Sequence, residues 1–399
     1  MPLYDYKAKD KIGNEITGTI ESQSEKTAID ILRDKNIFVV TISSGDKKRP
    51  VKRGKKVKRA DIVTFSRQLS TMANAGLPIL ESLNILHNQS ENQGMQDMLQ
   101  AITRKVESGY SLSEAFRMHE KVFGSLFVNM VNAGESSGKL PTILKRVASY
   151  MESVDKMNRK IKSAMMYPTI VTGACLCITL FLIIKVIPVF EEMYADFGGT
   201  LPAPTQVLIA FSNFLREWSI LFIIGVVAIF FIMRKLLRTE MGQVVFDTFK
   251  LKVPVFGLLI KKVVISRFAK TLSVLVESGI PILQALDIIK GVVGNKVVEA
   301  AVDKTTKAVR EGESIAVPLS TCPVFPIMVV KMIEVGEKTG NLEEMLEKMS
   351  EYYDDEVDAA VMGLTSIIEP LLMVVLGVVI GGIVICMFLP IFKISTMIH

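Results

Sequence analysis

Apolar positions follow a period of two at the start of this 399-residue chain, before a helical period takes over. Two short segments alternate apolar and polar residues, and the dipeptide Gly13-Asn14 between them is typical of a turn. A segment with Ala28, Ile31 and Leu32 on one helical face follows, and then a closing strand. These four segments are residues 3–8, 15–21, 24–34 and 38–42. The pattern predicts a small α/β module over residues 1–42.

A helical period begins near residue 60. Ile62, Phe65 and Leu69 fall on one face of a first helix. Gly76 is expected to end this helix as a left-handed cap, and Pro78 to begin the next one.

Further along, the polar pattern marks more helix ends. Residues 111–114 read Ser-Leu-Ser-Glu, a capping box in which the side chains of the first and last residues satisfy free backbone amides. Gly134 and Gly138 are expected to frame a turn, after which a long helix runs from Pro141 toward an apolar segment.

The whole helical pattern occurs twice. Residues 65–86 read FSRQLSTMANAGLPILESLNIL, residues 268–289 read FAKTLSVLVESGIPILQALDII, and Gly279 follows Gly76 by 203 positions. A unit of about 130 residues is therefore duplicated, which is longer than the 20–50 residues of a solenoid repeat. We call the two repeats copy one and copy two, and expect a bundle of about six helices in each. The predicted helical domains are residues 60–162 and 238–365.

Three apolar runs accompany the repeats. Residues 163–190 and 366–392 end the two copies and reach the roughly 20 residues that cross a bilayer core, whereas residues 218–237 form a shorter run between them. If both helical domains lie on one side of a membrane, the chain must cross back between them. We therefore expect all three runs to be transmembrane helices.

Basic residues near the span ends predict the orientation. Four of them precede the first span and three lie at or just after the end of the second, whereas residues 191–217 are mainly acidic where charged. By the positive-inside rule, the N-terminus and both helical domains are cytoplasmic, while residues 191–217 and the tail 393–399 are external. The first twenty residues are polar, so the first span is expected to act as an uncleaved insertion signal. The flanking basic residues are Lys156, Arg159, Lys160, Lys162, Arg234, Lys235 and Arg238.

Composition agrees with a mainly α, integral membrane protein that has two homologous cytoplasmic bundles, three transmembrane helices and a small N-terminal α/β module. Hydrophobic residues make up 49%, too many for an ordinary soluble protein, and charged residues 22%, too many for a chain wholly inside a membrane. The net charge of +6 gathers at the span ends and in residues 43–59, so it does not indicate nucleic-acid binding. This basic linker is either a contact for anionic lipid headgroups or a solvated spacer.

Patterns of catalytic, metal or cofactor chemistry are absent from the sequence. Gly134, Gly138 and Lys139 resemble a phosphate-binding loop, but the spacing is one residue short and no Ser or Thr follows the lysine. The three histidines show no metal-ligand spacing, and no nucleophile elbow occurs. Three of the four cysteines lie in the apolar runs, so no disulfide framework is expected.

One difference between the copies concerns charge. After a one-residue deletion the offset between them becomes 202, so that helix 139–163 corresponds to helix 341–365. The first carries seven basic and two acidic residues, and the second one basic and eight acidic residues. These are either two independently solvated faces or a pair of helices that attract each other, within one chain or between subunits.

Taken together, these segments resemble a known family, the inner-membrane platform proteins of type IV pilus and type II secretion machines (the PilC/GspF family). The resemblance covers essentially the whole chain and makes its signature residues candidates for partner docking. Copy two lacks the Arg-Gln pair of copy one. The docking candidates are Arg67, Gln68, Gly76, Pro78, Gly134, Glu135, Gly138, Gly279, Pro281, Gly336, Glu337 and Gly340, and Tyr167, Pro168, Glu369 and Pro370 are candidates at the starts of the first and third spans.

The resemblance implies a non-enzymatic scaffold that couples hexameric assembly or retraction ATPases in the cytoplasm to insertion of pilin subunits into a fibre. It also implies contact with the inner-membrane alignment proteins of such a machine and homo-oligomers. The alternative within the family is the platform of a type II secretion system. A transporter subunit is a more remote alternative, because three spans with few charges inside them make a poor pathway. An enzyme at the membrane would need a convergent acid–base or metal site.

Overall fold

The computed structural model describes residues 3–9, 15–22, 24–34, 37–44, 56–196 and 203–397. These fall into two compact units, residues 1–57 with 90–97, and residues 58–89 with 98–399. In the first unit, β1 (Leu3–Lys9), β2 (Glu15–Glu21) and β3 (Phe38–Ser44) form an antiparallel sheet of order β2-β1-β3. Helix α1 (Glu25–Asp34) packs on β3 with Ala28 and Leu32 buried. The expected turn at Gly13-Asn14 lies outside the described residues.

Copy one is helical throughout. Four phenylalanines, at positions 65, 116, 123 and 127, form its aromatic core, with neighbouring ring centroids 4.8–6.1 Å apart. The capping box at residues 111–114 is confirmed, because the Glu114 amide donates to Ser111 Oγ and the Ser111 amide donates to Glu114 Oε2. The helices are α2 (Arg59–Asn74), α3 (Ile79–Gln89), α4 (Gln93–Glu107), α5 (Leu112–Arg117), α6 (Glu120–Phe123), α7 (Ser125–Ser137) and α8 (Leu140–Ala164).

Copy two repeats this order of helices without a counterpart of the short α6. Its last helix, α19, is a single helix of 56 residues that continues into the third apolar run. The helices are α14 (Phe256–Glu277), α15 (Ile282–Lys290), α16 (Lys296–Arg310), α17 (Ala316–Ser320), α18 (Ile327–Thr339) and α19 (Leu342–Met397).

The prediction of a turn framed by two glycines was half wrong. Gly138 ends α7 in the left-handed conformation, with φ of 68°, as expected. Gly134 instead lies inside α7, where a Cβ would come within 3.1 Å of the Leu140 Cα. Its role is to let α7 approach α8 closely, since only glycine lacks the side-chain atom that would separate them.

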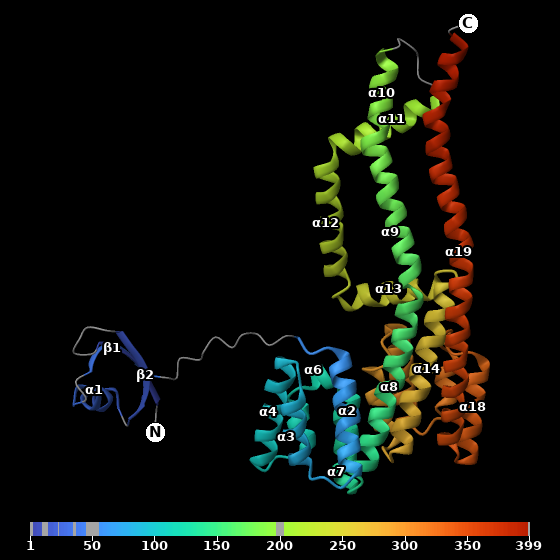
Figure 1. The fold of residues 1–399 in the computed structure, drawn as a ribbon. Coiled ribbons are helices and arrows are strands. Elements are labelled where there is room, and N and C mark those ends of the chain that lie inside the picture. Colours follow the sequence, from blue (N-terminus) through green and yellow to red (C-terminus); the bar gives the residue numbers. More distant parts are fainter. Residues whose placement is uncertain are drawn as a thin grey trace. The chain divides into compact units, whose positions relative to one another are not determined.

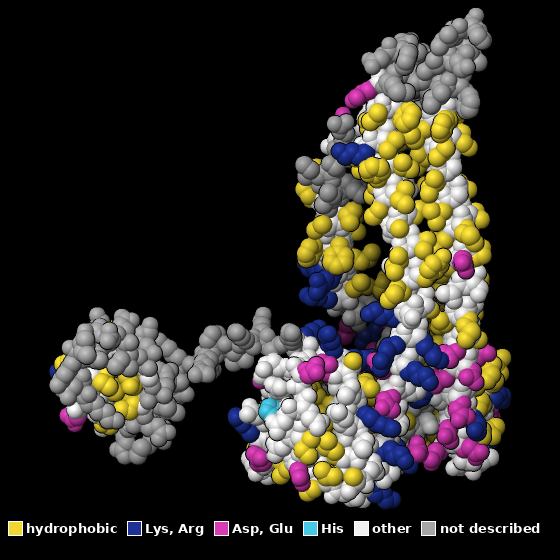
Figure 2. Space-filling view, in the orientation of Figure 1, with side chains coloured by type: hydrophobic (Ala, Val, Ile, Leu, Met, Phe, Trp, Pro, Cys, Tyr) yellow, Lys and Arg dark blue, Asp and Glu magenta, His cyan; other side chains and the backbone are white. Residues whose placement is uncertain are grey.

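Among the residues that the structure describes, two helices are long and apolar enough to cross a membrane, Leu140–Phe190 and Leu342–Leu389. Only 11% and 6% of their most apolar windows are buried, so these are not the covered core helices of a soluble domain. Figure 1 shows both rising from the helical domains, and Figure 2 shows their exposed apolar side chains. The first continues from α8 through α9 (Met166–Phe181), a π-helical turn (Leu182–Val186) and α10 (Ile187–Asp196).

The expected external segment is largely helical where the structure describes it. After α10, helix α11 (Ala203–Glu217) packs between the far ends of the two long helices. Ile183, Ile187, Ile209 and Ile383 form a buried apolar cluster there. Helix α12 (Ser219–Leu236) then covers the short apolar run.

Helix α13 (Glu240–Lys252) links α12 to copy two and has its faces reversed. Its inward side holds Asp247 and Leu251, both buried, and Asp247 accepts a hydrogen bond of 2.9 Å from the Lys296 amide. Its outward side carries Met241, Val245 and Phe249, which are 85%, 69% and 64% exposed. A helix on the surface of a soluble protein shows the opposite arrangement.

Candidate functional site

The two copies meet along α8, which lies against α14 and α19 of copy two. Lys160 forms an ion pair with Asp358, and Met157 joins a buried apolar cluster with Leu259 and Val357. The oppositely charged helices of the two copies therefore contact each other within one chain.

The centre of this contact is polar and buried. The Tyr150 hydroxyl lies 3.0 Å from Thr271 Oγ1, and both side chains are shielded from solvent. Burial raises the pKa of Tyr150, and the hydrogen bond with Thr271 opposes this only in part. Burial likewise lowers the pKa of the neighbouring Arg267. Tyr150 therefore stays a neutral hydrogen-bonding group, which satisfies Thr271 without burying a second charge.

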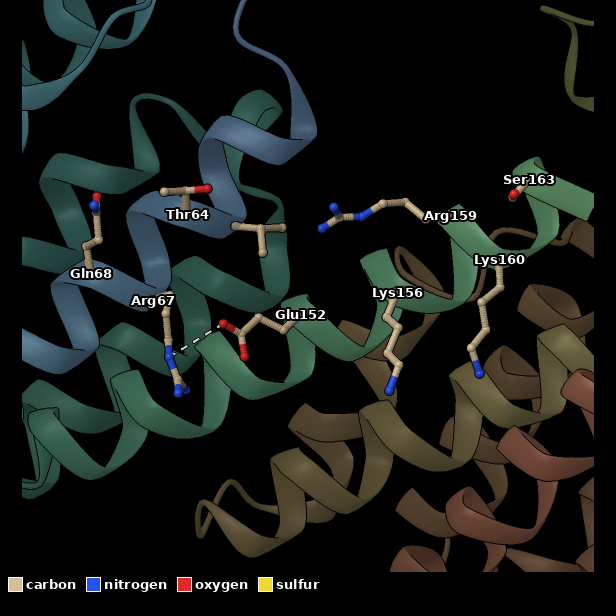
Figure 3. Close-up of a pocket in the computed structure, with 9 residues that line it drawn as sticks. Thr64, Arg67, Gln68, Glu152, Lys156, Arg159, Lys160 and Ser163 are labelled. Atoms are coloured by element: carbon tan, nitrogen blue, oxygen red, sulfur yellow. Dashed lines mark ion pairs between the residues drawn. The ribbon is translucent and has the colours of Figure 1, made fainter. Parts of the chain in front are cut away.

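A groove of about 770 Å³ opens on copy one between α2 and α8. Figure 3 shows Arg67 and Gln68 projecting from α2, and Arg67 Nε lies 3.5 Å from Glu152 Oε1 on α8. The groove holds four cationic side chains and one carboxylate, so it favours an acidic partner. Its lining residues are Val63, Thr64, Arg67, Gln68, Glu152, Lys156, Arg159, Lys160 and Ser163.

The structure thus brings together one pair of the expected docking residues, Arg67 and Gln68, with residues that the sequence marked only as charges flanking a span. The repeat indicates the ion pair of this site, because the equivalent positions of copy two also carry opposite charges. Glu152 corresponds to Asp354 at the 202-residue offset, and Arg67 to Lys270 at the 203-residue offset. Lys270 forms an ion pair with Asp354, so both copies place the same kind of pair at the same position.

Glu135 and Glu337, two other docking candidates, are used inside the fold. Glu135 accepts hydrogen bonds of 2.6 and 2.9 Å from the amides of Leu112 and Ser113, at the start of α5. Glu337 accepts bonds of 2.7 and 3.3 Å from the amides of Ile315 and Ala316, at the start of α17. Each carboxylate therefore satisfies free amides at a helix N-terminus, where negative charge is also favoured by the helix dipole.

The glycine and proline candidates also shape the chain. Gly76, Gly279 and Gly340 have φ of 83°, 76° and 72°, a backbone conformation that residues with a side chain rarely adopt. Pro78 and Pro281 stand directly before α3 and α15. Gly336 repeats the role of Gly134, since a Cβ there would come within 2.9 Å of the Leu342 Cα.

The candidates at the span starts are separate from the groove. Tyr167 is exposed and Pro168 is buried near the start of α9, whereas Glu369 and Pro370 are exposed within the unbroken α19. All four cysteines are free thiols. In the described part of the chain, no group of three or more His, Cys, Asp or Glu side chains is arranged to hold a metal ion.

Comparison with known proteins matches both copies to one family. The model of type II secretion system (T2SS), protein F covers residues 65–188 and 268–390, and the model of its N-terminal domain covers residues 1–43. The chain belongs to the type II secretion system protein F family. Membership of the protein F family, together with two exposed apolar helices, indicates an inner-membrane protein.

Relatives in the protein F family carry two kinds of name. The chain is 42% identical to "Type IV pilus assembly protein PilC" of Thermus thermophilus, over 99% of this chain and 98% of that protein. It is 44% identical to the protein of the same name from Myxococcus xanthus, over 85% and 81% of the two chains. It is 32% identical to "Type II secretion system protein F" of Vibrio cholerae, over 100% and 99%.

Proposed function

We propose that this protein is the non-enzymatic inner-membrane platform of a type IV pilus assembly machine, which couples cytoplasmic motor ATPases to insertion of pilins into the fibre. The observation that carries the proposal is the identity of 42% over almost the whole length of a type IV pilus assembly protein. The identity to type II secretion relatives is lower, at 31–32% over equally complete alignments. The platform of a type II secretion system is therefore the second candidate.

A scaffold role fits how the chain uses the residues that resemble a phosphate-binding loop. Gly134 packs within a helix, Gly138 caps α7, and Lys139 stands at the start of α8. A phosphate-binding loop needs a strand before it and free amides facing the ligand, and here a helix precedes the turn.

The proposed topology has three spans, with α12 as the return crossing between the two longer helices. The N-terminal module and both helical domains are cytoplasmic, and α11 and the C-terminus are external. The proposed partners are a hexameric assembly or retraction ATPase, pilin subunits, the inner-membrane alignment proteins and further copies of this chain. Anionic lipid headgroups are proposed for the basic linker, residues 43–59, and nucleic acid is not a partner.

Deletion of the gene tests this function directly. We expect the deletion strain to lose surface pili while mature pilin accumulates in the inner membrane, and the full-length protein to restore assembly. A tagged protein purified from membranes should bring the motor ATPase and pilin with it, and should hydrolyse ATP no faster than a detergent blank. Normal piliation combined with loss of a secreted enzyme would instead favour the type II secretion platform. ATP turnover that Lys139→Ala abolishes would contradict the scaffold role.

A further inference from the structure

The groove of copy two that corresponds to the one on copy one is filled, because α8 of copy one occupies it. Ser266 Oγ lies 3.9 Å from the Met157 sulfur, and the Thr271 hydroxyl meets Tyr150. Lys270 donates to Ser153 Oγ, and Asp358 pairs with Lys160. Ser266 and Thr271 are both 0% exposed as a result.

The same positions on copy one are open. At the repeat offsets, Val63 replaces Ser266, Arg67 replaces Lys270, Gln68 replaces Thr271 and Lys156 replaces Asp358. All four copy-one residues line the groove between α2 and α8, and the last three of them are exposed. The duplication has therefore produced two related grooves, of which only the one on copy two has an occupant within the chain.

The surface that would match the open groove is also exposed. The four residues with which α8 enters copy two are Tyr150, Ser153, Met157 and Lys160. Their counterparts on α19, at the 202-residue offset, are Tyr352, Asp355, Ala359 and Met362. Tyr352 is 47% and Met362 68% exposed, and the other two are exposed as well.

We propose that the α2–α8 groove of one chain binds the exposed face of α19 from a second copy, repeating between chains the contact that joins the two copies within a chain. Three of the four pairs fit this contact, whereas the fourth places Lys156 against Met362 where the contact within the chain has the ion pair of Asp358 and Lys160. Arg67, in place of Lys270, would meet Asp355, in place of Ser153, so that an ion pair replaces a hydrogen bond. Val63 would meet Ala359, and Gln68 would meet Tyr352. The open groove is basic and the α19 segment is acidic, so the two surfaces attract each other electrostatically.

The two helix faces also lie at the same distance, along their helices, from the starts of their spans. Tyr150 stands 18 residues before Pro168, and Tyr352 stands 18 residues before Pro370, on helices that continue into the apolar runs. Because an α-helix rises about 1.5 Å per residue, both faces lie at the same distance from the start of their spans. A second copy can therefore dock while its spans share the same bilayer. The contact is head-to-tail and leaves one groove and one face free, so it can extend until a ring closes.

Cysteine cross-linking in native membranes tests the pairing, with the full chain and its four native cysteines replaced by alanine. Gln68→Cys and Tyr352→Cys are placed on two differently tagged chains and co-expressed. Mild oxidation should join the two tags in one disulfide-linked dimer. Tyr150→Cys with Thr271→Cys on one chain reports the matching contact within the chain. Gln68→Cys with Val335→Cys, an exposed position on α18, is the control that should not cross-link.

Charge reversal gives a second readout. Asp355→Lys should reduce the mixed dimer about fivefold or more, because it places a cation against Arg67. Arg67→Glu combined with Asp355→Lys should restore the dimer, and Glu343→Lys, a reversal elsewhere on α19, should leave it unchanged. Absence of the mixed dimer in membranes where the 150–271 disulfide forms would overturn the proposal, as would cross-linking only between two copies of Gln68→Cys. This contact between chains is a property beyond the platform function. Cross-linking measures the contact and piliation measures the platform function, so either can fail without the other.

Discussion

Glu135 and Glu337 show how single residues hold each bundle together. They lie on α7 and α18, and each reaches across to the first amides of a short helix, α5 or α17. Those helices have six and five residues. Helices this short are not stable alone, so their amides need partners from elsewhere in the fold.

We expect Glu135→Ala to lower the free energy of unfolding by about 1–3 kcal/mol, since it removes two hydrogen bonds to a charged acceptor. Thermal unfolding of the purified protein in detergent measures this. Glu107→Ala, at an exposed site on α4, is the matched control and should leave the transition unchanged. Equal stability of both variants would mean that the α5 amides find other partners.

Asp303 supplies a prediction about pH. Its carboxylate accepts hydrogen bonds from Lys290 and Lys307, both at 2.8 Å, and these lower its pKa from 3.8 to about 2. A depressed folded-state pKa stabilises the fold above pH 3.8, and this contribution is lost as pH falls toward 2. Because Asp303 and its two lysine partners are partly exposed to solvent, Asp303→Asn should cost no more than about 1 kcal/mol at pH 7.

The measurement is the unfolding midpoint of wild type and Asp303→Asn between pH 7 and pH 2. The difference between the two proteins should shrink through this acidic range and vanish at its lower end. Glu311→Gln, a carboxylate at an exposed position, controls for the general effect of removing one charge. A difference that persists unchanged at the lowest pH would show that Asp303 acts through something other than its charge.

At the scale of elements, α13 is unusual because it exposes apolar side chains along one face. Glycines permit close backbone contacts at the turns before and after α13. A Cβ on Gly242 would overlap the Leu236 carbonyl oxygen, and a Cβ on Gly257 would lie 2.5 Å from the Leu251 oxygen. With Asp247 held inward, the exposed apolar side faces away from the protein. Arg234 and Lys235 shortly precede α13 in the chain, and Lys252 is its last residue. An apolar face with basic neighbours is typical of a helix at the surface of a bilayer.

We therefore expect Phe249→Trp, in a Trp218→Phe background, to be quenched in proteoliposomes by lipids brominated near the headgroup more than by lipids brominated deep in the chains. Val335→Trp, on α18, should be quenched by neither. Ile178→Trp, on α9, should be quenched strongly and reports that the protein has inserted. Quenching at residue 178 without quenching at residue 249 would rule out a membrane position for α13 while leaving the spans in place.

At the scale of the whole molecule, the prediction to check is the number of spans. A reporter fused after Lys290 should act as cytoplasmic, and one fused after Thr200 as external, because α12 would return the chain across the membrane. Reporters that are external at both positions would remove α12 as a crossing, because the chain would then stay on the side that it reaches through the first span. Substitution of Arg234, Lys235 and Arg238 by glutamine should weaken the orientation, since basic residues at span ends set it.

Much of the architecture could be predicted from the order of residue types. The helix periods, the capping box at residues 111–114 and the left-handed turn at Gly138 depend on neighbours within a few positions, so the sequence shows them directly. Gly134 was misread as part of that turn because a glycine that permits close packing looks the same in sequence as one that caps a helix. Glu135 was a docking candidate because it matches the family signature, and its bonds to amides 22 and 23 residues away are a contact that the sequence does not show.

The duplication, the apolar runs and the charge of each copy are determined by the sequence alone, because they depend only on which residues occur and in what order. The tertiary structure decides which surfaces remain available. The sequence places Arg67 and Lys270 at equivalent positions, yet the first is exposed and the second lies under α8 of the other copy. The same holds for α13, whose apolar side could equally have faced the core. Exposure depends on contacts between residues more than a hundred positions apart, and no local pattern specifies which of two similar faces those contacts will cover.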